Sequence, residues 1–336
     1  MNTTELREML EDEKSRAIFD ARINFKKDKR LSEFYNRLKS TGEKYTFREI
    51  DAFIHTLNKD NFYIWGCDDY AVYSYQVLVD SGYNVIGLLS DTKVKVDGID
   101  CFYWKEITEQ LEDCAVIVFQ RNVDDVPEYI LSKCNPLLLY SHVVGRCGHQ
   151  YFDYFLSQGE EYFVDAGALD GATTRDFIEW CDGNYGAVYA FEVNPLMVEE
   201  CDNNLRSTVE DKKLFYIECA LWDKQGEVSF DNSISKWSAH ISVDGKDMVK
   251  TDTIDNLIGN KPVTFIKFDI EGSELKALYG AKNCIINNRP RMAISVYHND
   301  DDMENIMEFL CKLDCGYRFA LRHYHSDAIE TILYVF

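Results

Sequence analysis

The sequence predicts an α/β protein with two successive sheets, and three observations support that prediction. Short apolar runs alternate with helix-length segments from Asn61 onward, which is the pattern of a parallel sheet with crossover helices. The alternation stops near residue 140 and begins again at Tyr162. The length of 336 residues also exceeds what one compact core usually holds, which favours two domains.

The N-terminal half is expected to contain a helical segment and then a small sheet. Leu6, Leu10 and Ile18 belong to a series of apolar positions at roughly helical spacing, which predicts helices over 3–57. The apolar runs at 62–65, 85–89, 115–119 and 137–140 predict parallel strands. We therefore expect a helical lead-in over 1–60, a small Rossmann-like α/β domain over 61–140, and a linker over 141–160.

The C-terminal half, 161–336, is expected to form a larger α/β domain. Five apolar runs predict successive parallel strands at 162–165, 187–192, 214–219, 263–269 and 291–298. Two further runs, 317–323 and 331–336, lie close together with a polar turn between them and predict an antiparallel hairpin. Five parallel strands followed by a hairpin give a seven-stranded sheet.

Charge and cysteine usage restrict the partners and the compartment. The chain has 58 acidic and 36 basic residues, a net charge of −22, so its surface would repel nucleic acid and acidic membranes. Its eleven cysteines are scattered without the close pairs of small secreted domains, which indicates reduced thiols. Neither a signal peptide nor a membrane span is evident. We expect a cytoplasmic protein that binds neither nucleic acid nor membrane, and a homodimer is an open alternative to a monomer.

The segment from Val164 to Gly171 carries the first candidate site. It joins an apolar strand to a helix that begins near Thr173. A glycine turn permits close backbone approach, and the free N–H groups at a helix N-terminus suit an anionic group. Glu192 ends the next strand, where an acid accepts ribose hydroxyls. Together these features predict an adenosine-type ligand.

Further motifs along the second half resemble those of the FkbM family of methyltransferases. They are Asp-Ala-Gly-Ala-x-x-Gly at 165–171, Phe-Glu-Val-Asn-Pro at 191–195, Ala-Leu-Trp-Asp at 220–223, Thr-Ile-Asp at 253–255, Phe-Ile-Lys-Phe-Asp-Ile-Glu-Gly-Ser-Glu at 265–274, Arg-Pro at 289–290 and Val-Tyr-His at 296–298. The resemblance covers about 161–336. It departs from the usual family pattern at Asp170, where Asn is common, and at Trp222, where small residues are usual. It implies a class I, seven-stranded methyltransferase sheet and S-adenosylmethionine as cofactor.

The resemblance also implies where the cofactor binds. Asp165 and Gly167 would face its methionine end and Glu192 its ribose. Cys219 and Ala220, at the end of the third strand, would lie beside the adenine. The residues Ala168, Gly171, Asn194 and Asp269 complete the expected cofactor site. Each position lies at or just beyond the carboxyl end of a strand, where ligands bind in open α/β sheets.

The acceptor is expected to bind beside the last two parallel strands. Lys267, Asp269 and Glu271 alternate, so they point the same way while the strand persists. The alternative for Lys267 and Glu271 is a purely structural role in an ion-paired strand end. Glu274 is expected to be a solvated charge in the first turn of a helix. We predict catalytic roles for Lys267 and Asp269, together with His298. Glu271, His298 and His323 are the expected substrate contacts.

His298 is the leading candidate for a general base, because an imidazole can take a hydroxyl proton near neutral pH. The alternative is a histidine that is only hydrogen-bonded at a strand end. Methyl transfer from a sulfonium needs little covalent help, so positioning alone can account for much of the rate. Alternatively, Asp269, Glu271 and His298 hold a divalent cation that lowers the hydroxyl pKa, although the metal-free mechanism is preferred.

The expected function is transfer of a methyl group from S-adenosylmethionine to a hydroxyl oxygen, most plausibly of a sugar or glycan acceptor. One alternative is a non-catalytic protein that keeps the cofactor pocket and only recognises a glycan or nucleotide-sugar. Another is a nicotinamide oxidoreductase that uses the first sheet. That sheet carries Cys67-Asp68-Asp69-Tyr70 where a dinucleotide site has glycines, and the carboxylates would repel a pyrophosphate. A degenerate domain for acceptor recognition or dimerisation fits it better.

Overall fold

The chain folds into two compact units, each built around its own sheet. The computed structural model describes residues 1–46, 59–134, 136–139, 145–194, 197–210, 212–231, 240–241, 245 and 247–336. One unit, called here the C-terminal unit, comprises Met1–Arg16, Gly148–His323 and Ile329–Phe336. The N-terminal unit comprises Ala17–Cys147 and Tyr324–Ala328.

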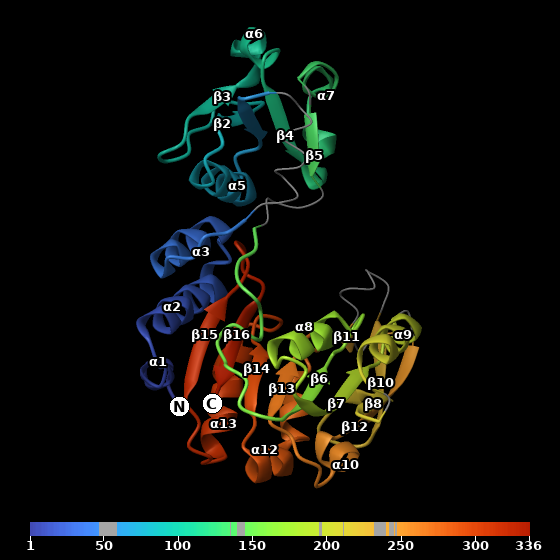
Figure 1. Ribbon diagram of the computed structural model, residues 1–336. Coiled ribbons are helices and arrows are strands. Elements are labelled where there is room, and N and C mark those ends of the chain that lie inside the picture. Colours follow the sequence, from blue (N-terminus) through green and yellow to red (C-terminus); the bar gives the residue numbers. More distant parts are fainter. Residues whose placement is uncertain are drawn as a thin grey trace. The chain divides into compact units, whose positions relative to one another are not determined.

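The N-terminal unit contains the parallel sheet that the first series of apolar runs predicts (Figure 1). Its described strands run in the order β3-β2-β1-β4-β5, and all neighbouring pairs are parallel. The strands are β1 (Phe62–Trp65), β2 (Val85–Ser90), β3 (Cys101–Tyr103), β4 (Ala115–Phe119) and β5 (Pro136–Leu139). The sequence analysis missed β3, a three-residue edge strand that is only half-buried and so lacks an apolar run.

Helices and 3-10 turns connect these strands. They are α5 (Asp69–Asp80), η2 (Trp104–Glu106), α6 (Thr108–Leu111), η3 (Gln120–Asp125) and α7 (Glu128–Lys133). At the start of α5, Asp68 accepts a hydrogen bond from the Ala71 N–H at 2.9 Å. Asp69 accepts one from the Leu31 N–H at 2.6 Å. Asp68 therefore occupies a backbone donor at the start of α5, where a dinucleotide's pyrophosphate would need it, whereas Asp69 binds the start of α3.

The N-terminal helices are α1 (Thr3–Glu8), α2 (Glu13–Asp28) and α3 (Leu31–Leu38), followed by η1 (Lys39–Thr41). They confirm the prediction of helices up to residue 38, and residues 47–58 lie outside the described part. The first segment extends the larger sheet. Leu10 forms a parallel bridge with Phe319, and the Glu11 N–H donates to the Phe319 carbonyl at 2.8 Å. Residues 1–16 therefore belong to the C-terminal unit.

The C-terminal unit has the predicted seven-stranded sheet, in the order β15-β16-β14-β13-β6-β7-β8. Its strands are β6 (Glu161–Ala166), β7 (Tyr185–Glu192), β8 (Leu214–Glu218), β13 (Phe265–Phe268), β14 (Arg291–Ser295), β15 (Phe319–His323) and β16 (Thr331–Val335). Strands β14, β13, β6, β7 and β8 are parallel, and β16 is antiparallel to both β14 and β15. The helices are α8 (Ala172–Trp180), α9 (Val198–Thr208), α10 (Ile254–Ile258), α11 (Glu274–Tyr279), α12 (Lys282–Asn288) and α13 (Asp302–Lys312).

A second, smaller sheet in this unit was not predicted. Its described strands are β9 (Ala220–Leu221), β10 (Gly226–Asp231), β11 (His240–Ile241) and β12 (Asp247–Asp252), in the order β11-β10-β12-β9. Phe230 and Val249 are among the few residues that it buries, together with Ala220. Short strands with one polar face produce no continuous apolar run, which explains why the sequence pattern did not reveal them.

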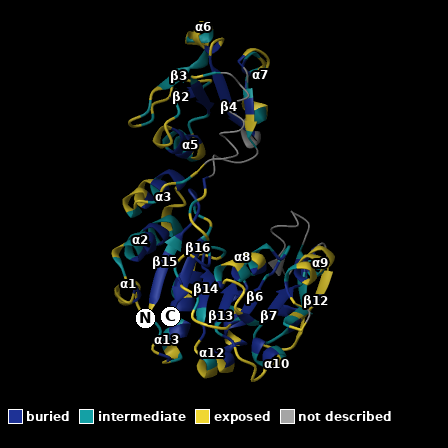
Figure 2. Cartoon of the chain, in the orientation of Figure 1, coloured by how far each residue is buried: buried dark blue, intermediate teal, exposed yellow. Residues whose placement is uncertain are grey.

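The core of the C-terminal unit is aromatic and includes the segment that the sequence analysis assigned to a linker. Phe163 and Phe177 stack at 4.3 Å between ring centroids. Phe152 packs against both, with centroid separations of 6.2 and 6.4 Å. Figure 2 shows most strands of this sheet as buried, whereas the edge strand β8 is partly exposed. Residues 148–160 are therefore part of the C-terminal unit, since their aromatic side chains are needed to fill its core.

A buried ion pair ties β6 to β14 at the amino ends of these strands. The Arg291 guanidinium donates to both Glu161 carboxylate oxygens, at 2.6 and 2.7 Å, and the Gln158 N–H donates to the same carboxylate at 2.8 Å. Thr264 donates a further hydrogen bond. Burial raises the pKa of Glu161, but the hydrogen bonds from Thr264, Gln158 and Arg291 outweigh burial and lower the pKa below its ordinary value.

Across the described residues, no helix has the length and apolar content needed to cross a membrane.

Candidate functional site

The loop after β6 forms the cradle that the motif at 165–171 predicts. Gly167 has φ +88°, and its N–H donates to the Phe191 carbonyl at 3.1 Å. A Cβ atom at this position would lie 2.0 Å from the Asp269 carbonyl oxygen. Glycine is therefore required here, both for the left-handed backbone and for the close approach of the chain after β13. Ala168 is buried, and Gly171 is the N-cap of α8.

Asp165 lies beneath this loop in a buried ion pair. Its Oδ2 accepts a hydrogen bond from Thr174 at 2.8 Å, and its Oδ1 lies 3.3 Å from Lys267 Nζ. Lys267 Nζ also donates to the Gly167 carbonyl at 2.6 Å. Both side chains are almost fully buried. The pair thus fixes the loop from below, on the side away from solvent.

Lys267 is held as a cation by these contacts. Burial lowers the pKa of its ammonium, but the Asp165 and Asp269 carboxylates outweigh burial and raise the pKa above its ordinary value. A charged lysine that donates a hydrogen bond to Gly167 and forms an ion pair with Asp165 positions both residues. This arrangement agrees with the ion-paired alternative for Lys267, while its predicted catalytic role has no direct support from this geometry.

Glu192, at the end of β7, is buried and accepts several backbone hydrogen bonds. Its Oε2 accepts from the Leu169 N–H at 2.7 Å, and its Oε1 accepts from the N–H groups of Val193 and Asn194 at 2.7 and 2.6 Å. A carboxylate has about four acceptor sites. These three bonds leave room for about one ribose hydroxyl in the present arrangement, where the sequence analysis expected two.

The predicted adenine side of the site lies where β8 ends and the small sheet begins. Cys219 is buried, with its Sγ 3.5 Å from the Lys250 carbonyl oxygen. Burial raises the pKa of its thiol to about 11, so the side chain is neutral. Ala220 is buried in β9 and pairs with Thr251. This neutral wall is compatible with an adenine ring.

Acidic side chains and one histidine converge at the carboxyl ends of β13 and β14. His298 Nε2 lies 3.5 Å from Asp269 Oδ1 and 3.7 Å from Glu271 Oε2. On the other side of the ring, His298 Nδ1 lies 3.0 Å from Glu274 Oε1. We call Asp269, Glu271, Glu274 and His298 the acid–histidine cluster. It brings together the predicted acceptor residues Asp269, Glu271 and His298.

The strand geometry differs from the predicted alternation. Strand β13 ends at Phe268, so Asp269 and Glu271 lie beyond it. Glu271 reaches the cluster through a left-handed turn, with φ +54° at Glu271 and +94° at Gly272. A non-glycine residue in this region costs about 1–3 kcal/mol and is usually retained at functional sites. Strand β14 likewise ends at Ser295, three residues before His298.

The prediction that Glu274 is a solvated helix charge is wrong. Its side chain is fully buried, and Oε1 also accepts a hydrogen bond from the Ile270 N–H at 2.8 Å. Glu274 is the first residue of α11, and the turn at 271–272 directs it inward. The sequence pattern could not predict this burial, because the direction of a side chain in the first turn of a helix depends on the geometry of the preceding turn.

Electrostatics within the cluster favour a charged imidazole. Burial lowers the pKa of His298, but hydrogen bonding and attraction to Glu274, together with the Asp269 and Glu271 charges, raise it to about 9. Burial raises the pKa of Glu271 to about 7 despite the nearby His298. In this state His298 carries a proton at neutral pH. It therefore cannot accept one there, which is at odds with the prediction of a neutral base.

Tyr151 joins the cluster from the segment assigned to the linker, and the sequence analysis missed it. Its hydroxyl donates to Asp269 Oδ2 at 2.5 Å, and its ring lies 5.5 Å from Lys267 Nζ. Burial is the main reason that the pKa of Tyr151 is raised well above its ordinary value. Tyr151 is not part of any sequence motif, so only the tertiary structure identifies it as a member of the site.

His323 lies apart from this cluster. It ends β15, which β16 separates from β14 in the sheet order. The side chain is 1% exposed, and Nδ1 lies 2.7 Å from Thr331 Oγ1 on β16. This burial accounts for the residue as part of the hairpin packing, and it gives no support to the predicted substrate contact.

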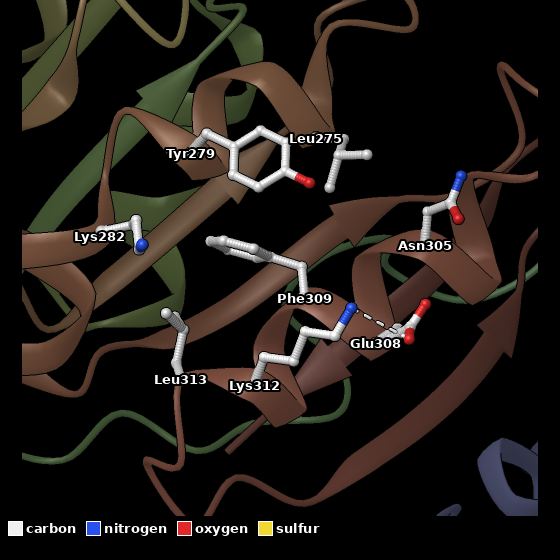
Figure 3. Close-up of a pocket in the computed structure, with 8 residues that line it drawn as sticks. All are labelled: Leu275, Tyr279, Lys282, Asn305, Glu308, Phe309, Lys312 and Leu313. Carbon is white, nitrogen blue, oxygen red and sulfur yellow. Dashed lines mark ion pairs between the residues drawn. The ribbon is translucent and has the colours of Figure 1, made fainter. Parts of the chain in front are cut away.

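A surface hollow of about 390 Å³ lies elsewhere on this unit, along helices α11, α12 and α13 (Figure 3). It is lined by Leu275, Tyr279, Lys282, Asn305, Glu308, Phe309, Lys312 and Leu313. Leu275 and Tyr279 are on α11, whose first residue, Glu274, is buried in the cluster. The predicted site residues do not line this hollow.

Comparison with known proteins places these observations in a family. Residues 165–319 match the family model described as the methyltransferase FkbM domain. A methyltransferase FkbM from Methylobacillus flagellatus has a similar structure, with a TM-score of 0.53 and 17% identity, over 96% of this chain and 99% of its own. This similarity supports the fold alone.

Two more distant structures also align. One is a putative rRNA-methylase from Clostridium thermocellum, with 14% identity and a TM-score of 0.37 over 55% of this chain and 89% of its own. The other is fibrillarin from Aeropyrum pernix in complex with S-adenosyl-L-methionine, with 11% identity and a TM-score of 0.33 over 54% of this chain and 67% of its own. No curated protein matches this chain. Residues 165–319 thus match the methyltransferase FkbM domain that the sequence motifs predicted, and the fold of the chain agrees with that match.

Proposed function

We propose that this protein transfers the methyl group of S-adenosylmethionine to a hydroxyl oxygen of a sugar or glycan-type acceptor. One observation carries the proposal. The backbone of Gly167, in the predicted cofactor loop, is in direct contact with the backbone of Asp269, in the acid–histidine cluster. A cofactor bound over the loop would therefore hold its methyl group beside the cluster.

The cofactor would use the residues on β6, β7 and β8. Its methionine end would lie over Gly167, whose position is fixed by Lys267, and Glu192 would accept a ribose hydroxyl. The adenine would lie against the neutral wall at Cys219 and Ala220. These strand ends are neighbours in the sheet, so one extended ligand can contact all of them.

The acceptor would bind at the acid–histidine cluster. Carboxylates accept hydrogen bonds from hydroxyl groups, and a sugar offers several such donors. Asp269 is the best placed, since Tyr151 holds its Oδ2 and leaves Oδ1 directed toward His298. Holding the acceptor oxygen in line with the methyl carbon and sulfur accounts for much of the rate of such a transfer.

Cofactor binding is tested by titration calorimetry of the full chain with S-adenosylmethionine, S-adenosylhomocysteine and NAD. We expect binding of both sulfur ligands and none of NAD, because Asp68 occupies a backbone donor at the start of α5 and the Asp69 carboxylate beside it would repel a pyrophosphate. Tight NAD binding would contradict the proposal, as would failure of both sulfur ligands to bind.

Acceptor chemistry is tested with methyl-labelled S-adenosylmethionine and a panel of sugars, oligosaccharides, amines and thiols. We expect label on hydroxyl oxygens, as ethers that resist mild base. Asp269→Asn should raise the acceptor KM more than it lowers kcat, while the exposed Glu160→Gln serves as the matched control. Transfer only to nitrogen or sulfur would refute the hydroxyl acceptor.

A further inference from the structure

The acid–histidine cluster contains buried polar atoms that the described residues do not satisfy. Asp269 Oδ1, Glu274 Oε2 and His298 Nε2 are buried and have no hydrogen-bond partner in the described part of the chain. The His298 side chain is 10% exposed, and that of Glu274 is fully buried. Burying an unpaired polar atom costs about 1–3 kcal/mol, so three of them together indicate a missing ligand.

The spacing of these atoms suits a metal ion. His298 Nε2 lies 3.5 Å from Asp269 Oδ1 and 3.7 Å from Glu271 Oε2, too far for good hydrogen bonds. Two ligands bound at about 2.1 Å to one cation lie roughly 3.0–3.4 Å apart, so small side-chain adjustments would complete a coordination shell. Ligand atoms of Asp269, Glu274 and His298 all lie within 4.8 Å of one another, whereas Glu271 is outside this group and would reach the ion by adjusting its partly exposed side chain.

The surroundings orient these atoms as protein metal sites usually do. Glu274 Oε1 lies 3.0 Å from His298 Nδ1, where it would accept the Nδ1–H and leave the Nε2 lone pair facing Asp269. A carboxylate behind the second nitrogen is the usual partner of a metal-bound histidine. Tyr151 in turn holds Asp269 through Oδ2, so Oδ1 remains available.

The charge of the cluster also favours a cation. It gathers the fully buried carboxyl group of Glu274 and the partly exposed carboxyl groups of Asp269 and Glu271 around the largely buried imidazole of His298. Carboxylates buried together repel one another unless a cation compensates for them. Asp165 already pairs with Lys267 below the loop.

We propose that the acid–histidine cluster binds one divalent metal ion through His298 Nε2, Asp269 Oδ1 and Glu271 Oε2, with Glu274 as the residue that positions the imidazole. Mixed imidazole and carboxylate donors suit ions such as Mn²⁺ and Zn²⁺. Sequence spacing suggested Asp269, Glu271 and His298 as an alternative metal set, and the buried Glu274 and the unsatisfied atoms now favour that alternative over the metal-free mechanism.

The role of the ion in catalysis rests on the proposed function. A metal-bound acceptor hydroxyl has a lowered pKa and releases its proton to solvent. Its oxygen then forms a bond to the methyl carbon as the methyl–sulfur bond breaks, and S-adenosylhomocysteine leaves with the electron pair. In this mechanism His298 is a ligand and not the general base.

Metal binding is tested without activity, by titrating the chelator-treated full chain with MnCl₂ and following free Mn²⁺ by electron paramagnetic resonance. We expect one saturable site per chain. His298→Ala should weaken it at least tenfold, and Glu274→Gln should weaken it about 10- to 100-fold. His149→Ala, which removes an exposed histidine of the same unit, should leave Mn²⁺ affinity unchanged. Circular dichroism confirms that each variant is folded.

The absence of a saturable site, or equal Mn²⁺ affinity in wild type and His298→Ala, would overturn the metal site. For the catalytic role, removal of the ion should lower methyl transfer at least tenfold while cofactor affinity persists, and Zn²⁺ or Mn²⁺ should restore it. Unchanged transfer by verified metal-free protein would overturn that role. If every hydroxyl acceptor fails, the proposed function is contradicted, whereas the Mn²⁺ titration still decides the metal site.

Discussion

Replacement of Lys267 by methionine tests whether a buried ion pair supports the cofactor loop. Lys267 Nζ lies 3.3 Å from Asp165 Oδ1 and donates to the Gly167 carbonyl at 2.6 Å. At an effective dielectric constant of about 20, two unit charges at that distance attract by roughly 5 kcal/mol. Desolvation offsets much of this attraction, but removing one partner leaves the other charge buried and uncompensated. The expected loss of unfolding free energy is therefore about 3–5 kcal/mol.

A second substitution separates the charge from the hydrogen bond. Asp165→Asn in the Lys267→Met background removes the uncompensated carboxylate and should recover part of the lost stability. The unpaired Gly167 carbonyl would still cost about 1–3 kcal/mol. Urea unfolding at neutral pH measures each difference, with the exposed Lys282→Met as control, expected within about 0.5 kcal/mol of wild type. If Lys267→Met also falls within 0.5 kcal/mol, or if the double variant is less stable than Lys267→Met, the ion pair does not support the loop as argued.

Three further predictions follow from the same unit. Gly167→Ala places a Cβ 2.0 Å from the Asp269 carbonyl oxygen at φ +88°, so it should abolish cofactor binding measured by calorimetry, and normal affinity would contradict the loop geometry. Glu161→Gln should lower the unfolding free energy by about 3–5 kcal/mol at pH 7. Because the folded-state pKa of Glu161 is lowered, the carboxylate's contribution is present above the ordinary pKa of 4.5 and is lost as pH falls below it, so urea unfolding near pH 4 should show a smaller difference. Glu192→Gln should weaken S-adenosylmethionine binding by about 1.5–3 kcal/mol, and an unchanged dissociation constant would place the ribose elsewhere.

The sequence determined the two sheets and the cofactor side of the site because their signals are local. Apolar runs mark strands such as β6 and β7, which are buried on both faces. The positions of Gly167 and Glu192 follow directly from them, since each lies at or just beyond the end of a strand. Periodicity and strand-end position therefore predicted where these residues lie without any knowledge of long-range contacts.

The acceptor side required the tertiary structure, because its residues converge through turns and long-range packing. The left-handed turn at Glu271 and Gly272 directs Glu274 into the interior, although a first-turn glutamate normally faces solvent. Tyr151 reaches Asp269 from 118 positions away in the sequence. The fold also reversed the expected chemistry of His298, because the three carboxylates gathered around it raise its pKa although burial alone would lower it. The sequence alone identified the strand ends where the cofactor is expected. Only the folded chain shows which charged side chains lie close together, and the shielding of those side chains from water determines how strongly they interact.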